Sequence, residues 1–539
     1  MQTVGVAFIF LTVLGMAAPP AFAAWTELPL GPSGRAVYVS SSQGDNANDG
    51  LSEASPKATI AAGFALLRDH HGDHLLLRRG DSFTLSPTLV WWKSGASAEE
   101  PIVLGAYGDA WMRPVIDTGL AEALHISPGF RSANTVRHLA IVGVQFRSAQ
   151  RDFNRRPFGL ATTPTNGGLG IRIVGVQTTA PQIVEDLLIE GCQFEFLEQP
   201  LVLEGPYSDS VQDVRVRRNQ FVDTYSTRGD PSALYVANVN GFLMEENLID
   251  GVQRAPGLDP ARTTSALAHA VYVQSTSRDV TLRDNIFARA YDGGMVRPGG
   301  VYEGNLVMDV TLGHHEGYMY YPSSLVHTEG IEARVAGNAF LKVGANNAIN
   351  AGNLRHAVIE GNVILSGPTT GGSGIWLIGM TYLDQVGVHD VLVQDNYVLG
   401  LRGLTAFGPS ISDVAVRHNQ FRAASTEVLD LSNYEAGDYA FAGNAYLSQR
   451  PANAWFRIDG FPRYGLAGWI AFAGEPDATA ASSVDPAAAP DIESYQASIG
   501  REPTMAAFLD KARRQWQRHW GEEYTAAAVI SYLRGQLGL

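Results

Sequence analysis

One short phrase recurs along most of this chain of 539 residues and restricts what it can fold into. An apolar residue alternates with a variable one, an Asn follows, and a large apolar residue stands two positions after the Asn. The clear copies contain Asn219, Asn285, Asn338, Asn362, Asn396 and Asn419, and weaker copies contain Asn247, Asn305, Asn444 and, in place of Asn, Cys192. Alternation predicts strands with one buried face. Recurrence every few tens of residues predicts coils that stack on their neighbours.

The Asn has two physical roles in this pattern. It tolerates a sharp bend of the chain, and its amide can hydrogen-bond the Asn of the next coil to form a ladder. The gap between successive bends is shortest, 20 residues, from Asn285 to Asn305 and longest, 38 residues, from Asn247 to Asn285. We therefore expect short gaps to hold one bare coil and long gaps to hold a coil with an outward loop.

The repeats, which cover Val136 to Tyr446, resemble the right-handed parallel β-helix of pectate lyases and other polysaccharide-acting proteins. The resemblance implies an all-β solenoid. It implies no single reaction, because one fold of this kind hosts many functions.

The segments outside the repeats predict four regions of the chain. Residues 1–23 are typical of a secretory signal peptide, since the apolar run is too short to span a membrane and Ala21 and Ala23 fit the cleavage rule. The remaining regions are an N-terminal cap with the first strands (24–135), the β-helix (136–450), and a linker with a helical tail (451–539).

Both ends of the predicted coil carry helical patterns. An amphipathic helix ending near Leu67 resembles the helix that plugs the open end of secreted bacterial β-helix proteins. Helices at 504–516 and 524–534 are expected to fold back on the coil, with Trp516 and Trp520 packing there rather than binding sugar.

Charge and cysteine content indicate where the chain works and what it meets. A signal peptide and a single cysteine, Cys192, predict a bacterial periplasmic or secreted protein that is stabilised by stacking rather than by disulfides. The net charge of −15 argues against a nucleic-acid partner. No later stretch is apolar enough to cross a membrane. We expect a monomer that binds a polysaccharide.

Strand phase places a group of side chains on the outside of one predicted sheet. Its members are Tyr235, Tyr272, Gln274, Arg297 and Trp376. Aromatic rings stack on the apolar faces of sugars, and a guanidinium binds their hydroxyls and carboxylates. These residues predict a groove for an elongated sugar chain. The alternative is that the tyrosines only pack across strands.

The fourth residue after the Asn forms a second predicted column. In three consecutive coils it is Arg289, Asp309 and Lys342. A Lys held beside an Arg has a lowered pKa and suits a catalytic base, while Arg289 would neutralise a substrate carboxylate. This pairing resembles that of β-helix lyases acting on uronate polymers. The alternative is a surface ion ladder bridged by Asp309.

A chemically rich excursion lies between Asn305 and Asn338. It contains His314, His315 and Glu316, followed by Tyr318, Tyr320, Tyr321 and His327. We predict a loop wall over the groove, with one His acting as acid or base; structural packing is the alternative. Adjacent histidines lack the spacing of a zinc site, so we predict no metal there. The oxygen-rich turn from Asp45 to Asp49 suits Ca²⁺ but is expected to be a solvated turn.

These columns favour a polysaccharide lyase that cleaves a uronate-containing polymer by β-elimination. Candidate bases and acids are Lys342, Tyr272, His269 and His314, and the developing enolate would be stabilised by Arg297, Arg289 or a bound Ca²⁺. Candidate substrate-binding residues are Tyr235, Gln274, Trp376, Asp309 and His315.

Three alternatives remain open at this stage. An epimerase would use the same parts and return the proton elsewhere. A glycoside hydrolase needs two carboxylates, for which Asp309 with Asp292 or Glu316 qualifies. A non-catalytic carbohydrate-binding solenoid needs only the aromatic groove.

Overall fold

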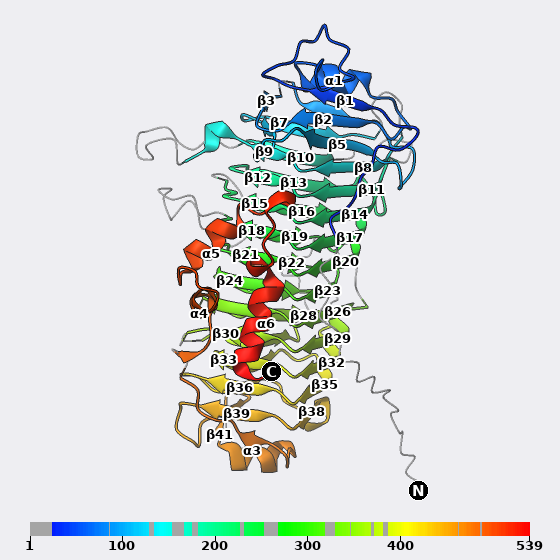
Figure 1. Ribbon diagram of the computed structural model, residues 1–539. Coiled ribbons are helices and arrows are strands. Elements are labelled where there is room, and N and C mark those ends of the chain that lie inside the picture. Colours follow the sequence, from blue (N-terminus) through cyan, green and yellow to red (C-terminus); the bar gives the residue numbers. More distant parts are fainter. Residues whose placement is uncertain are drawn as a thin grey trace, which may run out of the picture.

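The computed structural model shows three long sheets stacked around one axis (Figure 1). It describes residues 24–539 except 86, 129–133, 154–166, 175–181, 227–230, 253–267, 318–328, 345, 368–370, 381–385, 462 and 486–487. The predicted signal peptide, 1–23, lies outside the described residues.

Each coil contributes one strand to each sheet in turn. Sheet A contains β1 (Ala36–Val39), β2 (His74–Arg78), β5 (Ile102–Tyr107), β8 (Thr135–Val142), β11 (Ile183–Glu190), β14 (Val211–Arg217), β17 (Val239–Glu245), β20 (Arg278–Arg283), β23 (Gly300–Glu303), β26 (Ile331–Ala336), β29 (Leu354–Glu360), β32 (Val388–Gln394), β35 (Ile411–Arg417) and β38 (Tyr439–Ala442).

Sheet B follows the Asn of each repeat. It contains β3 (Ser82–Thr84), β6 (Val115–Asp117), β9 (Gln145–Arg147), β12 (Gln193–Glu195), β15 (Gln220–Val222), β18 (Leu248–Asp250), β21 (Ile286–Ala288), β24 (Leu306–Val310), β27 (Ala339–Val343), β30 (Val363–Leu365), β33 (Tyr397–Gly400), β36 (Gln420–Ala423), β39 (Ala445–Ser448) and β42 (Thr479–Ala480).

Sheet C completes each coil before the chain returns to sheet A. It contains β4 (Leu89–Trp91), β7 (Glu122–Ile126), β10 (Leu169–Val174), β13 (Gln199–Glu204), β16 (Leu234–Ala237), β19 (Val271–Val273), β22 (Met295–Val296), β25 (His314–Glu316), β28 (Ile349–Gly352), β31 (Ser373–Ile378), β34 (Arg402–Phe407), β37 (Leu429–Leu431), β40 (Phe456–Ile458) and β41 (Arg463–Tyr464). Strand pairs are parallel, and the described exception is β40 with β41. This is the parallel β-helix that the repeats predict.

The predicted asparagine ladder is present in full. From Asn219 to Asn444, the amide Nδ2 of each Asn donates to the Oδ1 of the Asn in the next coil at 2.9–3.1 Å. The backbone N–H of Cys192 donates to Asn219 at 2.8 Å, so the degenerate copy begins the ladder. Glu475 ends it by accepting from Asn444 at 2.8 Å.

The bend itself falls on the residue before the Asn, which corrects the prediction that the Asn takes it. The preceding residues have φ between 52° and 64° in all nine copies from Arg218 to Gly443, whereas no Asn of the ladder has positive φ. Gly or Asp occupies six of these nine positions because these residues enter the left-handed region at low cost. The Asn is therefore selected for its amide, not for its backbone.

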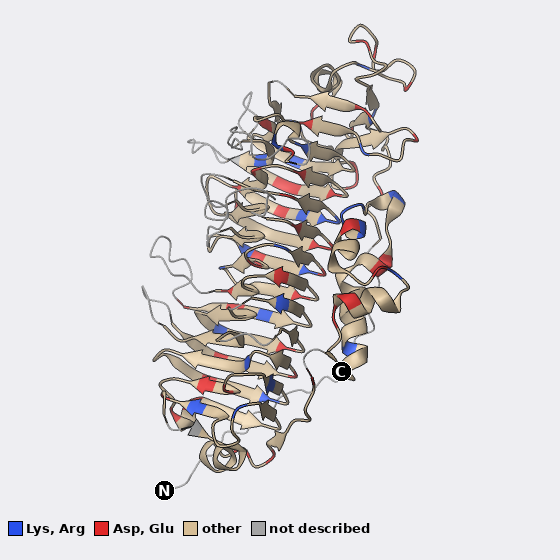
Figure 2. Ribbon diagram, turned by 90° about the vertical axis from the view of Figure 1, so that its left-hand side faces the viewer, with Lys and Arg blue, Asp and Glu red and all other residues tan. Residues whose placement is uncertain are grey.

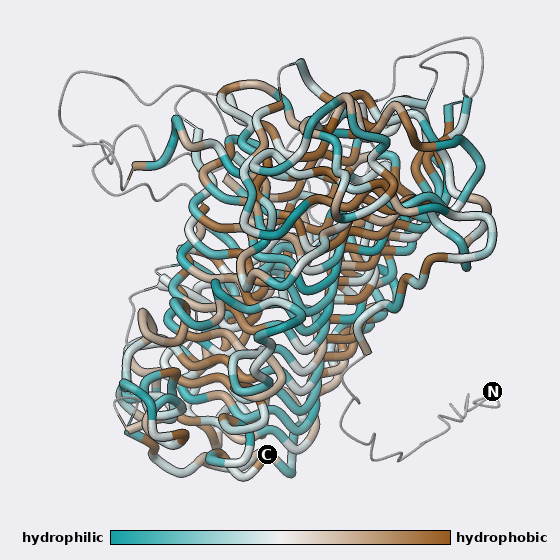
Figure 3. Tube along the Cα trace, turned by 45° about the horizontal axis from the view of Figure 1, so that its top comes forward, coloured by the Kyte–Doolittle hydropathy of each residue, from teal (hydrophilic) through white to brown (hydrophobic). Residues whose placement is uncertain are grey.

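Large apolar side chains two positions after the Asn, or after the residue that stands in its place, stack inside the coil. Phe146, Phe194 and Phe221 form a continuous stack, with ring centroids 5.1 and 4.8 Å apart. In Figure 3, apolar segments recur from coil to coil along the molecule. Cys192 is fully buried among them, and burial raises the pKa of its thiol to about 11, so it is an inert core residue.

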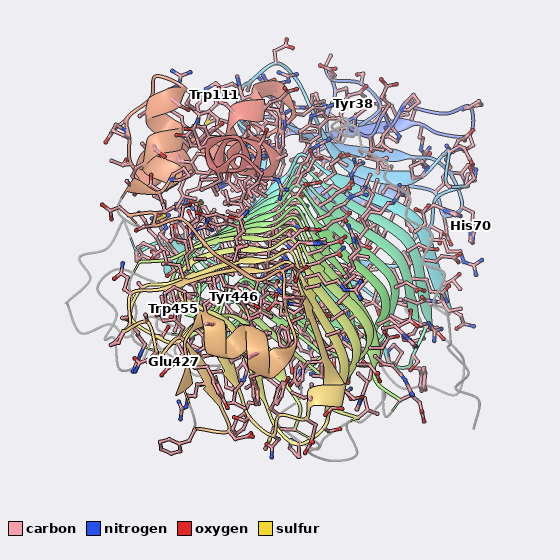
Figure 4. All side chains as sticks on the ribbon, turned by 90° about the horizontal axis from the view of Figure 1, so that it is seen from below. Tyr38, His70, Trp111, Glu427, Tyr446 and Trp455 are labelled. Carbon is pink, nitrogen blue, oxygen red and sulfur yellow. The ribbon has the colours of Figure 1, made fainter. Side chains whose placement is uncertain are left out.

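Helices close both ends of the coil. Helix α1 (Ile60–Leu66) buries Ile60 and Phe64 over the first strands, as the amphipathic pattern predicts. Helix α3 (Leu466–Ala473), which the sequence patterns did not indicate, buries Trp469 at the other end, stacked on Phe456 at 4.6 Å. Figure 4 looks into the coil from this end, where Tyr446 is labelled.

The C-terminal tail covers the outer face of sheet B (Figures 1 and 2). It contains α4 (Ile492–Ser498), α5 (Met505–Ala512) and α6 (Ala526–Leu537). The last two match the predicted helices, and the first was not predicted. Phe508, Leu509 and Val529 are buried against apolar side chains of sheet B. None of the described helices is long and apolar enough to span a membrane.

Candidate functional site

Sheet C carries a continuous outer column of polar and aromatic side chains, called here the aromatic column. Consecutive register partners place its members one above another in adjacent coils: Tyr235, Tyr272, Met295, His315, Asn350 and Trp376. Alternation explains the placement, because their strand neighbours such as Val271, Val273 and Ile375 point into the core. The predicted common sheet for Tyr235, Tyr272 and Trp376 is confirmed by this register.

A His–Asp pair lies at one side of this column. His269 Nδ1 is hydrogen-bonded to Oδ2 of the fully buried Asp292. The other carboxylate oxygen of Asp292 accepts from the backbone N–H groups of Ala270 and Gly294 at 3.2 and 3.0 Å, which fixes the carboxylate. Asp292 therefore holds the proton of His269 on Nδ1, and Nε2, which has no partner among the described residues, can act as a base. The His269 side chain keeps 7% of its surface exposed.

Tyr272 connects this pair with the rest of the column. Its ring stacks on the imidazole of His269, with centroids 4.9 Å apart, and on Tyr235 at 5.7 Å. The guanidinium of Arg297 lies 5.1 Å from the Tyr272 ring centroid. Gln274 Nε2 donates to the Tyr235 hydroxyl at 3.4 Å. Burial raises the pKa of Tyr235, so its hydroxyl stays protonated at neutral pH.

Arg297 is a cation without a carboxylate partner among the described residues. Its Nε is buried and has no hydrogen-bond acceptor in the described part of the chain. Because a buried guanidinium N–H is costly to leave unpaired, this group is suited to an anionic or hydroxyl-bearing ligand. Arg297 and Gln274 share a second outer column, since their backbone N–H groups bond successive coils at Val273 and Val236.

His315 belongs to the aromatic column rather than to a loop wall. It pairs with Met295 and Asn350 in register, and Asn350 Nδ2 lies 3.5 Å from its Nδ1. Burial lowers the pKa of His315, so the imidazole is neutral near pH 7 and can exchange hydrogen bonds with a neutral ligand. Beyond it, the buried Nε1 of Trp376 has no partner among the described residues.

His314 and Glu316 point into the core, which corrects the prediction that His314 lies in a wall over the groove. His314 is in register with Ile349, and Glu316 with Val296 and Ala351, all of which face inward. Both side chains are almost fully buried, and His314 Nε2 lies 2.7 Å from Glu316 Oε2. Burial lowers the pKa of His314 to about 3 and raises the pKa of Glu316 well above its usual range. The pair is therefore neutral, with Glu316 donating the proton.

The second predicted column lies on sheet B, away from the aromatic column. Lys342 pairs with Glu493 of α4 at 2.5 Å, and Arg289 pairs with Asp250 at 2.5 Å. Arg513 of the tail reaches the same Asp250. The two predicted columns therefore lie on different faces of the coil. Arg289 and Lys342 contact the tail or its anchoring carboxylate, and Asp309 stands one residue before the end of β24 with a φ of 50°.

The positions of these side chains also exclude the carboxylate pairs predicted for a glycoside hydrolase, Asp309 with Asp292 or with Glu316. Asp309 lies on sheet B, Glu316 faces the core, and Asp292 is bonded to His269. No two of them share an exposed groove.

Two residues of the site were not recognised in these roles from the sequence. Asp292 was considered only as a hydrolytic carboxylate, and Asn350 was not considered. A register built from the bends would have aligned Asn350 with Trp376. The Asp292–His269 contact depends on an isolated β-bridge, which the repeat pattern does not predict. Tyr318, Tyr320, Tyr321 and His327 lie outside the described residues.

The described residues contain no group of three or more His, Cys, Asp or Glu side chains suited to a metal ion. In the oxygen-rich turn, Asp45 and Asp49 accept from the backbone N–H groups of Ala47 and Leu51. Asn46 accepts from Ala58 and Thr59. These side chains stabilise the turn.

Several solved structures resemble this chain at low sequence identity. A mannuronic acid specific polysaccharide family 6 lyase from the human gut microbiota is 13% identical over 79% of this chain and 91% of that chain, with a TM-score of 0.44. Pectate lyase Pel9A is 15% identical over 82% of this chain and 83% of that chain, with a TM-score of 0.31. The GH136 lacto-N-biosidase from Eubacterium ramulus is 14% identical over 79% and 67%, with a TM-score of 0.32.

With TM-scores below 0.5 and identities of 13–15%, these likenesses carry no argument about the reaction. No protein-family model and no curated protein matches the chain.

Proposed function

We propose that the protein is a polysaccharide lyase whose site is the aromatic column with His269, Asp292 and Arg297. The observation that carries this proposal is the His269–Asp292 pair beside the unpaired guanidinium of Arg297. A base and a cation on one face are the two groups that β-elimination from a uronate needs. Among the predicted bases, Lys342 lies on another sheet and His314 inside the core, which favours His269.

The reaction follows from these positions. Nε2 of His269 takes the proton from C5 of a bound uronate, and Arg297 stabilises the negative charge that develops on its carboxylate. The C4–O bond breaks as the C4–C5 double bond forms, and the electron pair of the C4–O bond leaves with the oxygen. That oxygen takes a proton from the Tyr272 hydroxyl, which stacks beside His269. Asp292 keeps its hydrogen bond to Nδ1 and stabilises the imidazolium until solvent returns His269 and Tyr272 to their starting states.

Tyr235, His315, Asn350 and Trp376 bind the flanking sugars in this account. Their aromatic faces and neutral polar groups suit pyranose rings. An epimerase would begin with the same proton abstraction and return the proton to the opposite face of C5, without breaking the C4–O bond.

The test is a panel of uronate-containing and neutral polysaccharides, following ultraviolet absorbance of unsaturated ends together with reducing sugar. We expect both signals to rise on a uronate polymer with the parent protein and to be lost in His269→Ala. Lys342→Ala is the matched control and should keep full activity, because that side chain contacts the tail. Reducing ends without absorbance would contradict the lyase, as would an active His269→Ala variant.

A further inference from the structure

The arginines of sheet C differ in whether a carboxylate already neutralises them. Arg172 lies 4.0 Å from Glu122. Near the other end, Arg402 pairs with both Glu427 and Asp430, and Arg457 pairs with Asp430. Glu427 is labelled at that end in Figure 4. Arg297, which directly follows β22, is the one arginine with a described side chain on or next to these strands that lacks such a partner among the described residues.

One carboxylate on the same face is also unpaired. Glu204 ends β13, is half-buried, and has no ion pair or hydrogen bond among the described residues. It belongs to the outer column that continues through Ala237 and Gln274 to Arg297. Glu204 and Arg297 are thus three coils apart, or roughly 14 Å at the usual strand spacing.

Among the described residues, the outward side chains between these two charges, and those of the aromatic column just past Arg297, are neutral. Tyr235, Tyr272 and Gln274 lie between them, and neutral His315, Asn350 and Trp376 continue past Arg297. Along these two columns a polymer therefore meets one negative position, a neutral stretch, one positive position and a second neutral stretch.

A polymer made only of uronates fits this pattern poorly. A sugar residue advances a chain by about one strand spacing, so such a polymer would place a carboxylate in nearly every coil. One of them would face Arg297, but another would approach Glu204, and the rest would lose water without gaining a cation. A uronate flanked by neutral sugars has none of these costs.

Resting on the proposed function, we infer that the groove takes a heteropolymer in which isolated uronates alternate with neutral sugars, with the uronate at Arg297 and a neutral sugar at Glu204. Glu204 acts as a specificity residue by excluding a carboxylate from its position.

The experiment measures binding, so that it does not depend on turnover. His269→Ala protein is titrated calorimetrically with oligosaccharides of one uronate only and with oligosaccharides of the same length that alternate a uronate with a neutral sugar. We expect the alternating oligosaccharide to bind about tenfold tighter or better. Adding Glu204→Arg to the His269→Ala protein should strengthen binding of the uronate-only oligosaccharide. The ratio of the two dissociation constants should therefore become smaller.

Glu53→Arg is the matched control, because it changes the net charge equally at an exposed position of the N-terminal cap. Glu53→Arg should leave the ratio of the dissociation constants of the two oligosaccharides unchanged. Equal or tighter binding of the homopolymer, no binding of either oligosaccharide, or no effect of Glu204→Arg would overturn the inference. If the protein binds the alternating oligosaccharide selectively but the parent cleaves no polymer, the proposed lyase activity is refuted and the proposed preference for a heteropolymer stands.

Discussion

At the scale of single residues, the account depends on how Asp292 orients His269. The carboxylate accepts two backbone N–H bonds with one oxygen and holds the imidazole with the other. The role of the second oxygen can be tested with a side chain that keeps the oxygen bonded to the backbone and replaces the oxygen bonded to His269.

Asp292→Asn should therefore fold and bind but turn over poorly. The Asn oxygen can still accept from Ala270 and Gly294, whereas its NH2 donates to Nδ1 and moves the imidazole proton to Nε2, where it blocks the base. We expect kcat to fall by about 10³ to 10⁴ with KM within a factor of about three. Steady-state kinetics on the best polymer measures this.

Asp309→Asn is the matched control and should keep the parent kcat, because that side chain lies on sheet B. An Asp292→Asn enzyme with parental kcat would contradict the role of the pair.

The sequence predicts some residues of the site well and others not at all, for a physical reason. Tyr235, Tyr272 and Trp376 alternate with apolar residues, so their outward direction is encoded locally. His314 and Glu316 break this rule, because polar residues at inward positions look like a surface loop until their partners are known. Lys342 has its strand position encoded, but its partner Glu493 follows 151 residues later and no local pattern announces it.

At the scale of elements, strand β25 buries two titratable groups that should make stability depend on pH. The folded-state pKa of Glu316 is raised, so the folded protein binds this proton more tightly than the unfolded chain. Its contribution to folding is complete below the unfolded pKa of about 4.3 and is lost as pH rises toward the folded pKa, at about 1.4 kcal/mol per pH unit.

Glu316→Gln removes that loss while leaving a side chain that can donate to His314. We expect the unfolding free energy of the variant, minus that of the parent, to increase steadily from pH 5 to 8, by about 1.4 kcal/mol per unit at most. Denaturant titrations at several pH values measure it. The control is Glu332→Gln, an exposed side chain on β26.

A flat difference for Glu316→Gln across this range would show that Glu316 is ionised in the core. The lowered pKa of His314 acts in the opposite direction, since its contribution is lost as pH falls from about 6.5 toward about 3. This loss of the His314 contribution at low pH should remain in both Glu316→Gln and Glu332→Gln.

The asparagine ladder is the element that the sequence predicts most completely, since the repeat itself encodes each partner. Asn338→Ala removes the acceptor of two bonds from Asn305 and leaves the Tyr302 carbonyl without its amide donor. We expect a loss of about 2–4 kcal/mol of unfolding free energy, since these groups are buried. Denaturant titration measures it, and Asn453→Ala in an exposed turn should change little.

A loss below about 0.5 kcal/mol in Asn338→Ala would contradict the importance of the ladder. The first coils show the limit of the repeat, because β1 to β7 join the same sheets without any ladder Asn and the phrase is visible only from Val136.

At the scale of the whole molecule, one arginine fastens the tail to the coil. Arg513 pairs with Asp223 at 2.9 Å through both of its terminal nitrogens and with Asp250 at 2.5 Å through Nε. The apolar side chains of α5 and α6 lie against sheet B around this contact.

Arg513→Ala would leave Asp223 and Asp250 buried together with only Arg289 to neutralise them. We expect the unfolding free energy to fall by about 3–5 kcal/mol and limited proteolysis to remove the tail first. Arg514→Ala should have little effect, because its pair with Asp510 is exposed. Equal protease resistance of Arg513→Ala and the parent would contradict this anchoring.

The origin of the oxygen in the products distinguishes elimination at His269 and Arg297 from hydrolysis. The parent protein is incubated with its best uronate heteropolymer in water enriched in heavy oxygen, and the products are weighed by mass spectrometry. Elimination predicts unsaturated products with no heavy oxygen from the cleavage step in the parent and no products in His269→Ala. Saturated products carrying heavy oxygen at the new reducing end would contradict the account.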